Sequence, residues 1–270
     1  MQHEIDILYI TFNRLSYTKE TLPALVENAE APFHLTIVDN GSTDGTVDYL
    51  KQFARSHCKI LSAIRFLEFN TGISQPTNAF WKASKAEFLG KVDNDTLYPQ
   101  GWLNRLLEAH LATKRLGVIG GFHFNTKYVD MENLARRVID VEGVQLVPDA
   151  FIGGCCYLFR RSLQRQRGLL SVGKLKTHGW TEYQSEICRS GKINGYLWPL
   201  LQVEHFDDPL NKHNLAFSEH REISKISLAE KGIPLDRETQ LAWYKKDAAR
   251  VVSGISLKIL LAQSRSTINK

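Results

Sequence analysis

The sequence has few cysteines, no long apolar run and no basic leader at its start. Its four cysteines show no Cys-x-x-Cys spacing, and the neighbours Cys155 and Cys156 would face opposite sides of a strand. We therefore expect all four to be reduced and structural. The apolar runs have the length of strands, which predicts neither a secretory signal nor a membrane span. The expected location is the cytoplasm.

Low-complexity segments, internal repeats and clear linkers are also lacking. With 270 residues, of which 43% are hydrophobic and 23% charged, the chain can form one sizeable core and a smaller appendage, and disordered or fibrous classes are excluded. Its net charge of +5 lies entirely from residue 210 onward, where 11 Lys/Arg face 6 Asp/Glu. These basic residues form no dense stripe, so nucleic-acid binding is not expected.

The first half of the chain alternates apolar segments of strand length with segments of helix length. Strands separated by helices indicate right-handed crossovers and a mostly parallel sheet flanked by helices, so the predicted fold class is α/β, with one domain over residues 1–210. The predicted strands cover residues 5–10, 35–38, 60–66, 88–92 and 117–121, and the predicted helices cover residues 15–28, 46–53, 75–86 and 101–113.

The alternation is lost after about residue 125. Residues 127–147 are predicted to be a mixed excursion with hairpin or loop character, and a strand-like pattern returns at 150–159. Residues 211–270 are expected to be a helical extension packed on the domain, with helices over 215–231 and 236–263. Their apolar spacing favours docking on the core or a homodimer contact over a peripheral contact with the inner face of a membrane.

Polar residues follow each predicted strand. Because the carboxyl ends of parallel strands meet at one edge of a sheet, these residues should converge where open α/β sheets bind ligands. The acidic pair Asp93 and Asp95 stands out, although Asp-x-Asp alone also fits a solvated turn or a helix cap. The segments expected to converge are residues 11–14, 39–45, 70–72 and 93–95.

In order and spacing, these segments resemble the motifs of family-2 glycosyltransferases. The matching segments are TFNR at residues 11–14, VDNGSTDGT at 38–46, NTG at 70–72, VDNDT at 92–96 and PQGWL at 99–103. The resemblance implies a GT-A-type, Rossmann-like catalytic domain. It also implies an inverting, metal-dependent enzyme that moves a sugar from a nucleoside-diphosphate sugar, with a UDP-sugar favoured, to a hydroxyl of a glycan or lipid-linked saccharide.

The resemblance assigns the nucleotide-sugar to the carboxyl ends of the strands. Asp39 resembles the carboxylate that accepts a hydrogen bond from the nucleotide base, whereas Asp44 is predicted to cap the next helix. Arg14 would either pair with phosphate or lie solvated at a helix start. The predicted nucleotide-sugar-binding residues are Thr11, Asn13, Arg14, Asp39, Asn70, Gly72, Asp93, Asn94, Gly154 and Trp180.

Two of these residues have an ordinary packing role as the alternative. Gly154 would allow the sugar to approach closely or let two strands pack tightly. Trp180 would stack on a sugar face or be buried.

The same resemblance implies a divalent cation, Mn²⁺ or Mg²⁺. Asp95 is the expected direct ligand because hard carboxylate oxygens suit both ions. His205, after a late strand, resembles a downstream metal contact, with Glu204 and Asp207 as alternatives.

The catalytic base is predicted on the segment 179–189. The family usually carries two adjacent acids there, followed by an acidic residue, an apolar residue and Cys-x-Arg, whereas this chain has Glu182-Tyr183 and ends in Cys188-Arg189. Glu182 is the predicted base and Glu186 the reserve, with surface ion pairing as the alternative for both.

Two other classes of protein remain open at this point. A nucleotidyltransferase acting on sugar phosphates also pairs carboxylates on Mg²⁺, but it usually has a Gly-rich phosphate loop, and residues 11–14 contain no glycine. A non-catalytic nucleotide- or sugar-binding module would keep Asp39 and Asp93 without needing a base. Release of free nucleoside diphosphate would distinguish the transferase from both.

Overall fold

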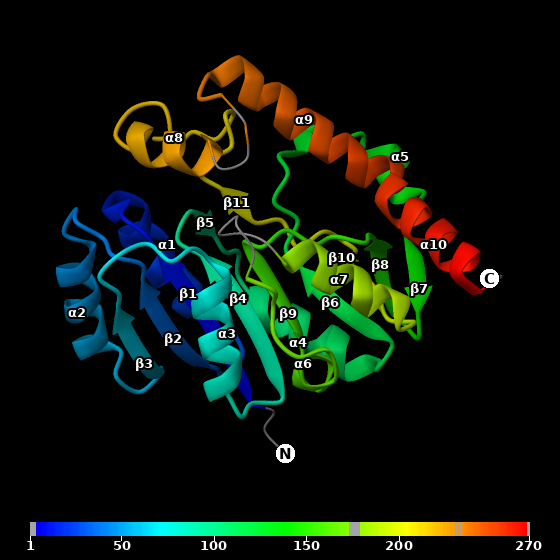
Figure 1. Cartoon of the computed structure of the whole chain (residues 1–270), viewed down its shortest axis with the longest axis horizontal. Helices are drawn as coiled ribbons and strands as arrows, with labels where there is room; N and C mark the ends of the chain where they lie inside the picture. Colours follow the sequence, from blue (N-terminus) through cyan, green and yellow to red (C-terminus); the bar gives the residue numbers. More distant parts are fainter. Residues whose placement is uncertain (1–3, 173–178, 230–231, 233, 269–270) are drawn as a thin grey trace.

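The computed structural model describes residues 4–172, 179–229, 232 and 234–268. At its centre lies a nine-stranded sheet in the order β3-β2-β1-β4-β9-β6-β10-β8-β7, with helices on both faces (Figure 1). β8 and β9 run against the other strands of the sheet. The sheet is therefore mixed but mostly parallel, which confirms the α/β class.

The elements of the first half nearly coincide with the predicted ones. The apolar strands lie at the centre of the sheet, and each amphipathic helix packs its apolar side on one of the two faces. The elements are β1 (Ile5–Thr11), α1 (Leu15–Glu27), β2 (His34–Asp39), α2 (Thr46–Ser56), β3 (Leu61–Phe66), α3 (Ser74–Ala83), β4 (Phe88–Asp93), β5 (Thr96–Leu97), α4 (Trp102–Ala112) and β6 (Leu116–Gly120).

The second half adds antiparallel strands to this sheet. The mixed excursion contains a β7–β8 hairpin, as predicted, whereas β9 begins only at Cys156 because residues 151–155 form a loop rather than a strand. The elements are η1 (Thr126–Tyr128), α5 (Met131–Ala135), β7 (Ile139–Val141), β8 (Val144–Pro148), β9 (Cys156–Arg160), α6 (Arg161–Arg167), α7 (Trp180–Arg189), β10 (Ile193–Leu197) and β11 (Glu204–His205).

The chain ends in three helices, α8 (Arg221–Ala229), α9 (Arg237–Ser253) and α10 (Ile255–Ile268). The prediction of a helix from residue 215 was wrong, because turns occupy residues 216–220 and the helix begins at Arg221. Its predicted end at 230–231 lies outside the described residues. A single helix over 236–263 was also wrong: Gly254, with φ +63°, separates α9 from α10.

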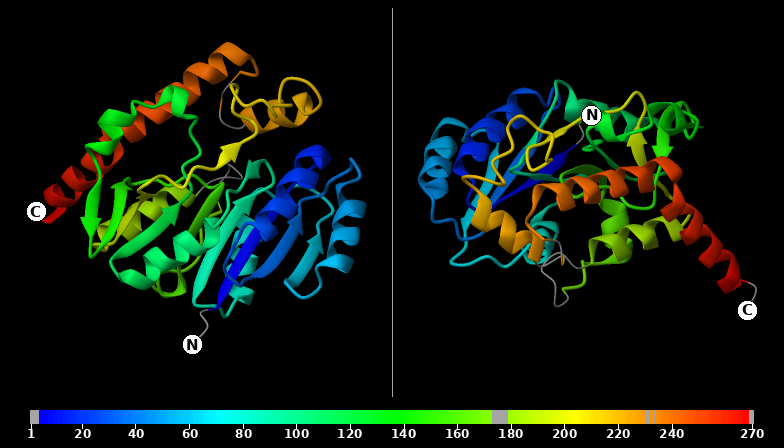
Figure 2. Two further views of the ribbon diagram at one scale, coloured as in Figure 1. Left: turned by 180° about the vertical axis from the view of Figure 1, so that it is seen from behind. Right: turned by 90° about the horizontal axis from the view of Figure 1, so that it is seen from above.

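The C-terminal helices pack on the rest of the chain. α9 contacts α5 and η1, and α10 contacts α7. Ala248 and Val251 of α9 are fully buried. Figures 1 and 2 show α8 and α9 lying over the carboxyl-terminal edge of the central strands. These helices therefore cover the edge of the sheet where the polar loops converge.

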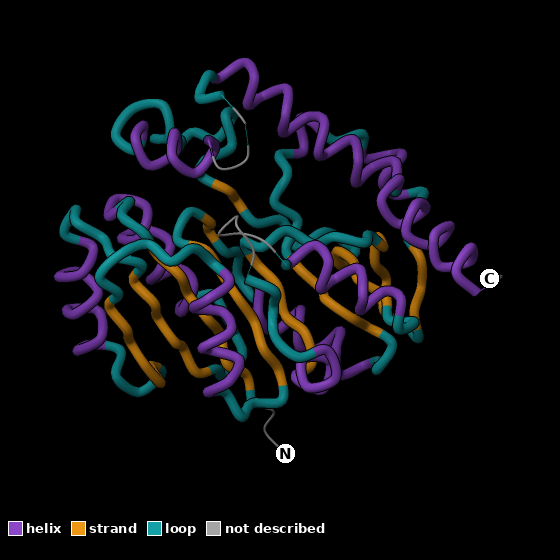
Figure 3. The backbone as a smooth tube through the Cα atoms, viewed as in Figure 1, coloured by secondary structure: helices purple, strands orange, loops and turns teal. Residues whose placement is uncertain are grey.

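Two hydrophobic cores hold the sheet in place, one on each face. Figure 3 shows the strands of the sheet in orange and the helices around them in purple. One core joins the sheet to α1, α2 and α4, and the other joins it to α3, α7 and α9. Of the cysteines, Cys155 and Cys156 are buried while Cys58 is exposed, and all four are free thiols. The cores fix the strand ends, and thereby the loops that follow them.

A buried histidine on α4 makes stability depend on pH. His110 is fully buried and its Nε2 lies 3.0 Å from the carbonyl oxygen of Leu158. Burial lowers the pKa of His110 to about 4 from its ordinary value of 6.5. As pH falls from 6.5 towards 4, His110 therefore takes up a proton in the unfolded chain but not in the folded one. The free energy of unfolding consequently decreases as pH falls through this range.

We predict that His110→Gln weakens this pH dependence. The neutral amide does not titrate, so the free energy of unfolding of the variant should fall by about 3 kcal/mol less than that of the wild type between pH 6.5 and 4. Urea titrations of both proteins across this range give the measurement. Parallel pH profiles would show that His110 has the same pKa in the folded and the unfolded chain, and would contradict the lowered value.

Candidate functional site

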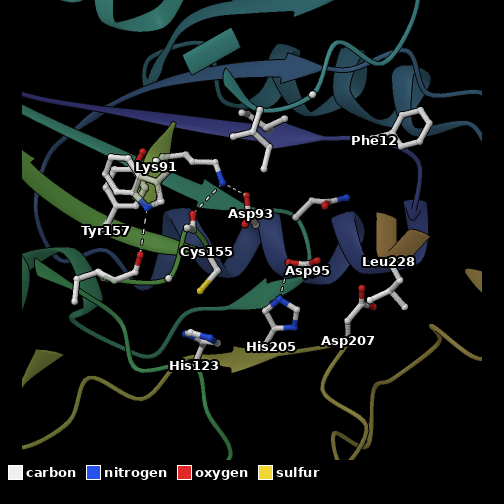
Figure 4. Close-up of a pocket in the computed structure, with 18 of the residues that line it drawn as sticks. Phe12, Lys91, Asp93, Asp95, His123, Cys155, Tyr157, His205, Asp207 and Leu228 are labelled. Atoms are coloured by element: carbon white, nitrogen blue, oxygen red, sulfur yellow. Dashed lines mark hydrogen bonds and ion pairs between the residues drawn. The ribbon is translucent and has the colours of Figure 1, made fainter. Parts of the chain in front are cut away.

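A cavity of about 630 Å³ lies between the carboxyl ends of the central strands and the C-terminal helices. Its walls come from the loops after β1 and β4, residues 70–77, the loop 151–155, the start of α7, β11, α8 and α9. Figure 4 shows Asp95, His205 and Asp207 together in this cavity, with Lys91 and Asp93 farther along the same wall. The predicted convergence of the strand ends is therefore present.

Asp95 lies at the centre of a charged cluster. Arg14 Nη1 is 2.7 Å from Asp95 Oδ2, and Arg14 Nη2 is 2.7 Å from Asp207 Oδ2. On its other side, Asp95 Oδ1 lies 3.7 Å from His205 Nε2. In this structure Arg14 is therefore buried and joins two carboxylates.

Short strand pairing places His205 beside Asp95. β11 pairs with β5 so that His205 lies opposite Thr96, the residue after Asp95. The backbone N–H of Phe206 also donates to the carbonyl oxygen of Asp95, at 2.7 Å. Glu204, the neighbouring alternative ligand, is exposed and does not line the cavity. The histidine prediction therefore gains a structural basis that the glutamate lacks.

The charges around Asp95 keep it ionised. Burial acts to raise the pKa of Asp95, but His205 and the Arg14 guanidinium together hold it below its ordinary value. Conversely, Asp207 and Asp95 raise the pKa of Arg14 above its ordinary value, although burial alone would lower it. At neutral pH Asp95 is therefore a carboxylate, and the Arg14 guanidinium neutralises part of its charge.

Asp93 has a separate cationic partner, Lys91. This lysine lies within β4, is only 2% exposed, and donates from Nζ to Asp93 Oδ1 and, at 2.9 Å, to the carbonyl oxygen of Gly154. Burial raises the pKa of Asp93, an effect that Lys91 opposes. Lys91 thus ties the acidic loop to the loop 151–155 on the facing wall.

Asn94 joins the acidic loop to the first loop. Its Nδ2 donates to Thr11 Oγ1 at 2.9 Å and to the carbonyl oxygen of Asn13 at 3.1 Å. Its carbonyl oxygen accepts from Thr21 Oγ1 at 3.0 Å. Thr11 and Asn94 line the cavity while their polar groups mainly hold the two loops together.

The loop after β2 is held by hydrogen bonds from its own side chains. Asp39 is fully buried and does not line the cavity; its Oδ2 accepts from the backbone N–H groups of Ser42 at 2.9 Å and Gly41 at 3.2 Å. Asn13 also lies outside the cavity wall, with its Oδ1 accepting from the backbone N–H of Thr43 at 2.7 Å. In this structure both side chains hydrogen-bond to loop backbone and do not line the cavity.

Asn40 is the residue of this loop that lines the cavity. Its Nδ2 donates to the carbonyl oxygen of Gly72 at 2.9 Å, and its Oδ1 accepts from the backbone N–H of Thr71 at 3.0 Å. Asn70 and Gly72 line the same wall, and Gly72 has a φ of +78°, which favours glycine. Asp44 accepts from the first backbone N–H groups of α1 and α2, the helix-start role expected of it.

The two predicted base residues lie differently from what was expected. Trp180 and Thr181 line the cavity, whereas Glu182 is exposed and contributes nothing to the described wall. Glu186 accepts from Arg189 Nη1 at 2.6 Å and from Arg167, and it also does not line the cavity. Burial would raise the pKa of Glu186, but these arginines lower it. In this structure Glu186 is therefore an ion-pairing residue, the alternative given for it above.

Trp180 and Gly154 form part of the wall facing the acidic loop. The Trp180 ring stacks on Tyr157, with centroids 4.3 Å apart, and its Nε1 donates to the carbonyl oxygen of Ile152 at 3.2 Å. A Cβ on Gly154 would lie 3.8 Å from Lys91 Nζ, an ordinary contact. Trp180 is thus held in an aromatic stack while still lining the cavity.

The donor groups at Asp95 fit a divalent cation. Cis ligands of an octahedral ion at about 2.1 Å lie about 3 Å apart, so a small approach would bring Asp95 Oδ1 and His205 Nε2, now 3.7 Å apart, onto one ion. Asp207 Oδ1 is buried and has no hydrogen-bond partner among the described residues. Since the described residues contain no cluster of three protein ligands, other ligands would have to come from the substrate or water.

Sequence reasoning missed three of these features. The role of Lys91 could have been predicted, because a lysine inside an apolar strand requires a buried anionic or hydrogen-bonding partner. The pairing of Arg14 with Asp207 joins residues far apart in the chain and has no local signal. The cavity-facing residues of α9 were also missed, because their helix was assigned only a packing role.

Comparison with known proteins places this site in a family. The sequence profile described as Glycosyl transferase family 2 matches residues 6–167. Over 104 residues the chain is 24% identical to TuaG of Bacillus subtilis (strain 168), whose name assigns it to teichuronic acid biosynthesis as a glycosyltransferase. That match covers 38% of this chain and 40% of TuaG, so the chain matches about two fifths of the relative's length.

Solved structures share the fold. The whole chain aligns with 81% of the mannosyltransferase PcManGT from Pyrobaculum calidifontis in complex with GDP-Man and Mn²⁺, with a TM-score of 0.61 and 16% identity. TarS 1–349 of S. aureus in complex with UDP aligns over 76% of this chain and 60% of that chain, with a TM-score of 0.58 and 16% identity. At such identities the likeness establishes the fold.

The structure has no helix, within its described residues, that is both long and apolar enough to cross a membrane. The family profile covers more than half of the chain, and its motifs form the loops that line the cavity. The chain therefore belongs to glycosyltransferase family 2.

Proposed function

We propose that this protein transfers a sugar from a nucleoside-diphosphate sugar, with a UDP-sugar as the first candidate, to a hydroxyl of a glycan or lipid-linked saccharide. The transfer inverts the anomeric carbon and depends on Mn²⁺ or Mg²⁺. The observation that carries the proposal is the pairing of Asp95 with His205 in one cavity with the 70–72 loop and Gly154. Among the classes considered, membership of the family favours glycosyl over nucleotidyl transfer.

Asp95 and His205 would hold the cation, which when bound would offset the charge of the departing diphosphate. Arg14 keeps one oxygen of Asp95 occupied, so that the other faces His205. Lys91 holds Asp93 against the loop 151–155. These residues orient the acidic loop before substrate enters, which reduces the reorganisation that binding requires.

The solved complexes support a nucleotide sugar as the donor, but they contain two different bases, guanine and uracil. PcManGT was solved with GDP-Man and Mn²⁺, and TarS 1–349 with UDP and with UDP-GlcNAc. In this chain Asp39 is engaged within its own loop, so recognition of uracil by that residue requires the loop to rearrange.

A panel of nucleotide sugars tests the proposal. The full chain is incubated with UDP-, GDP-, dTDP- and ADP-linked sugars, with and without Mn²⁺, and the release of nucleoside diphosphate and of pyrophosphate is measured. We expect nucleoside diphosphate from one base class, faster with Mn²⁺. Pyrophosphate exchange would indicate a nucleotidyltransferase, and donor binding without turnover even in the presence of saccharides would indicate a binding module.

Glu182 remains our proposal for the base. It lies on the first turn of α7, directly after cavity-lining Thr181, and would take the proton of the acceptor hydroxyl as its oxygen bonds to the anomeric carbon and the bond to the diphosphate breaks. We predict that Glu182→Gln retains donor binding and loses transfer by about 10²-fold or more.

The matched control is Glu186→Gln, which removes a paired glutamate from the same helix and should leave transfer unchanged. Calorimetry for donor binding and chromatography of the glycosylated product give the two readouts. If Glu182→Gln transfers sugar at the wild-type rate, the base must be a carboxylate of the cavity wall, and Asp247 on α9 is then the one to replace.

A further inference from the structure

One face of α9 forms a wall of the cavity. The side chains that line it recur every three or four residues, which places them on one side of the helix. The opposite side carries exposed residues such as Lys245 and Lys246. A helix docked only for stability would turn apolar side chains inward, but this face is polar and aromatic. Its cavity-lining residues are Gln240, Trp243, Tyr244, Asp247 and Arg250.

The side-chain amide of Gln240 is a hydrogen-bond donor without an acceptor among the described residues. Gln240 is 3% exposed and lines the cavity, yet its Nε2 has no partner among the described residues. Ser224 on α8 lines the same cavity, is equally buried, and its Oγ also has no partner there. A buried amide without a hydrogen-bond partner lowers the stability of the fold. An amide of this kind in a cavity wall points to a ligand whose oxygen accepts the missing hydrogen bond.

The aromatic residues next to Gln240 connect this wall to the cation site. Tyr244 Oη lies 3.4 Å from His205 Nδ1. Trp243 meets Tyr244 edge-on, with ring centroids 5.2 Å apart, and is 37% exposed. A partly exposed indole beside hydrogen-bonding groups suits the apolar face and hydroxyl edge of a sugar ring. A ligand on this wall would therefore lie beside the reacting end of a bound donor.

The charges on the wall are balanced. Arg250 pairs with Asp149 at 3.1 Å and with Asp247 at 2.7 Å. The other Lys and Arg side chains of the described cavity wall, Lys91 and Arg14, are also paired with carboxylates. A phosphorylated or carboxylated ligand would find no uncompensated cation on this wall, whereas a neutral sugar needs none.

We propose that this face of α9 is the acceptor subsite and that it takes a neutral saccharide. A sugar oxygen accepts the hydrogen bond of Gln240 Nε2, and the apolar face of the same ring packs on Trp243. The proposal rests on the proposed function, because an acceptor presupposes transfer. It adds the chemical class of the acceptor and the helix that recognises it.

The test uses methyl glycosides of glucose, galactose, mannose and N-acetylglucosamine, each compared with its 6-phosphate. Binding to the full chain is followed by NMR at the side-chain amide of Gln240, identified by its loss in Gln240→Met, and at the Trp243 indole. We expect at least one neutral glycoside to shift both signals. We also expect Gln240→Met and Trp243→Ala to weaken its binding about tenfold, as loss of one hydrogen bond or packing surface would.

Two controls separate recognition from folding. Gln240→Met should melt at or above the wild-type temperature without ligand, because methionine of similar size removes an unpaired buried amide. Lys246→Met, on the outer side of the same helix, should bind the glycoside like the wild type. A lower melting temperature of Gln240→Met would identify Gln240 as a packing residue and overturn the proposal.

Release of nucleoside diphosphate with and without the glycoside separates this proposal from the proposed function. The glycoside should stimulate nucleoside-diphosphate release by the wild type and by Lys246→Met, whereas Gln240→Met should need about tenfold more glycoside for the same stimulation. If the wild type acts on no donor, the proposed function fails, and the NMR titration still decides whether the wall binds sugar. The proposal of a neutral acceptor subsite would be overturned if none of the neutral glycosides shifts the two NMR signals, or if only the 6-phosphates do.

Discussion

Asp95→Asn is expected to reduce cation-dependent sugar transfer by about 10²- to 10³-fold, the scale of losing one charge-stabilising group in an active site. Asparagine keeps an oxygen that accepts from Arg14 Nη1, now 2.7 Å from Asp95 Oδ2, but supplies no anionic ligand. The measurement is the initial rate of nucleoside-diphosphate release at several Mn²⁺ concentrations. The variant should remain folded, because the packing around this position is unchanged.

Glu204→Gln is the matched control for Asp95→Asn. Glu204 precedes His205 on β11 but is exposed and does not line the cavity, so its loss should leave the rate and its Mn²⁺ dependence unchanged. Equal rates for Asp95→Asn and the wild type would remove Asp95 from the reaction. A large effect of Glu204→Gln instead would move the cation to the other side of β11.

Arg14→Met should have the largest effect on stability. It leaves Asp95 and Asp207, both largely buried, without the guanidinium that now lies between them. Breaking a buried ion pair by removing one partner costs about 3–5 kcal/mol. For a chain of this size each kcal/mol corresponds to about 2–4 °C, so the melting temperature should fall by roughly 10 °C. Scanning calorimetry measures the change.

Two further melting curves show whether charge is the cause. Mn²⁺ should stabilise Arg14→Met more than it stabilises the wild type, because the cation would replace a lost positive charge between carboxylates. The double variant Arg14→Met, Asp207→Asn should melt above Arg14→Met, because one uncompensated carboxylate has been removed. A double variant less stable than the single one would show that Arg14 acts through packing.

The strand ends were predictable from the sequence because their signals are local. The alternation of apolar strand segments with helix segments indicated which loops follow parallel strands. Loops at the carboxyl ends of parallel strands lie at the same edge of the sheet, however the helices pack. This logic brought Asp95 into one cavity with Asn70 and Gly72. His205 was found by resemblance, and the pairing of β11 with β5 supplies the physical reason for its position.

The other residues depended on contacts that no local pattern contains. Asp39 lies at the end of a strand, as expected, but its carboxylate accepts hydrogen bonds from the N–H groups of the following loop and does not line the cavity. Glu186 has the spacing of a helix neighbour of Glu182, yet Arg167, from another helix, pairs with it. The orientation of α9 follows from its packing on α5 and η1, which periodicity alone does not specify.

The central claim is that Asp95 and His205 bind a divalent cation together with a nucleoside diphosphate. Titration of Mn²⁺ followed by electron paramagnetic resonance, with and without UDP or GDP, tests it most directly. The account predicts that one of these nucleotides increases Mn²⁺ binding to one ion per chain and that Asp95→Asn abolishes the increase. Nucleotide binding with the same affinity in the presence and absence of Mn²⁺ would contradict it.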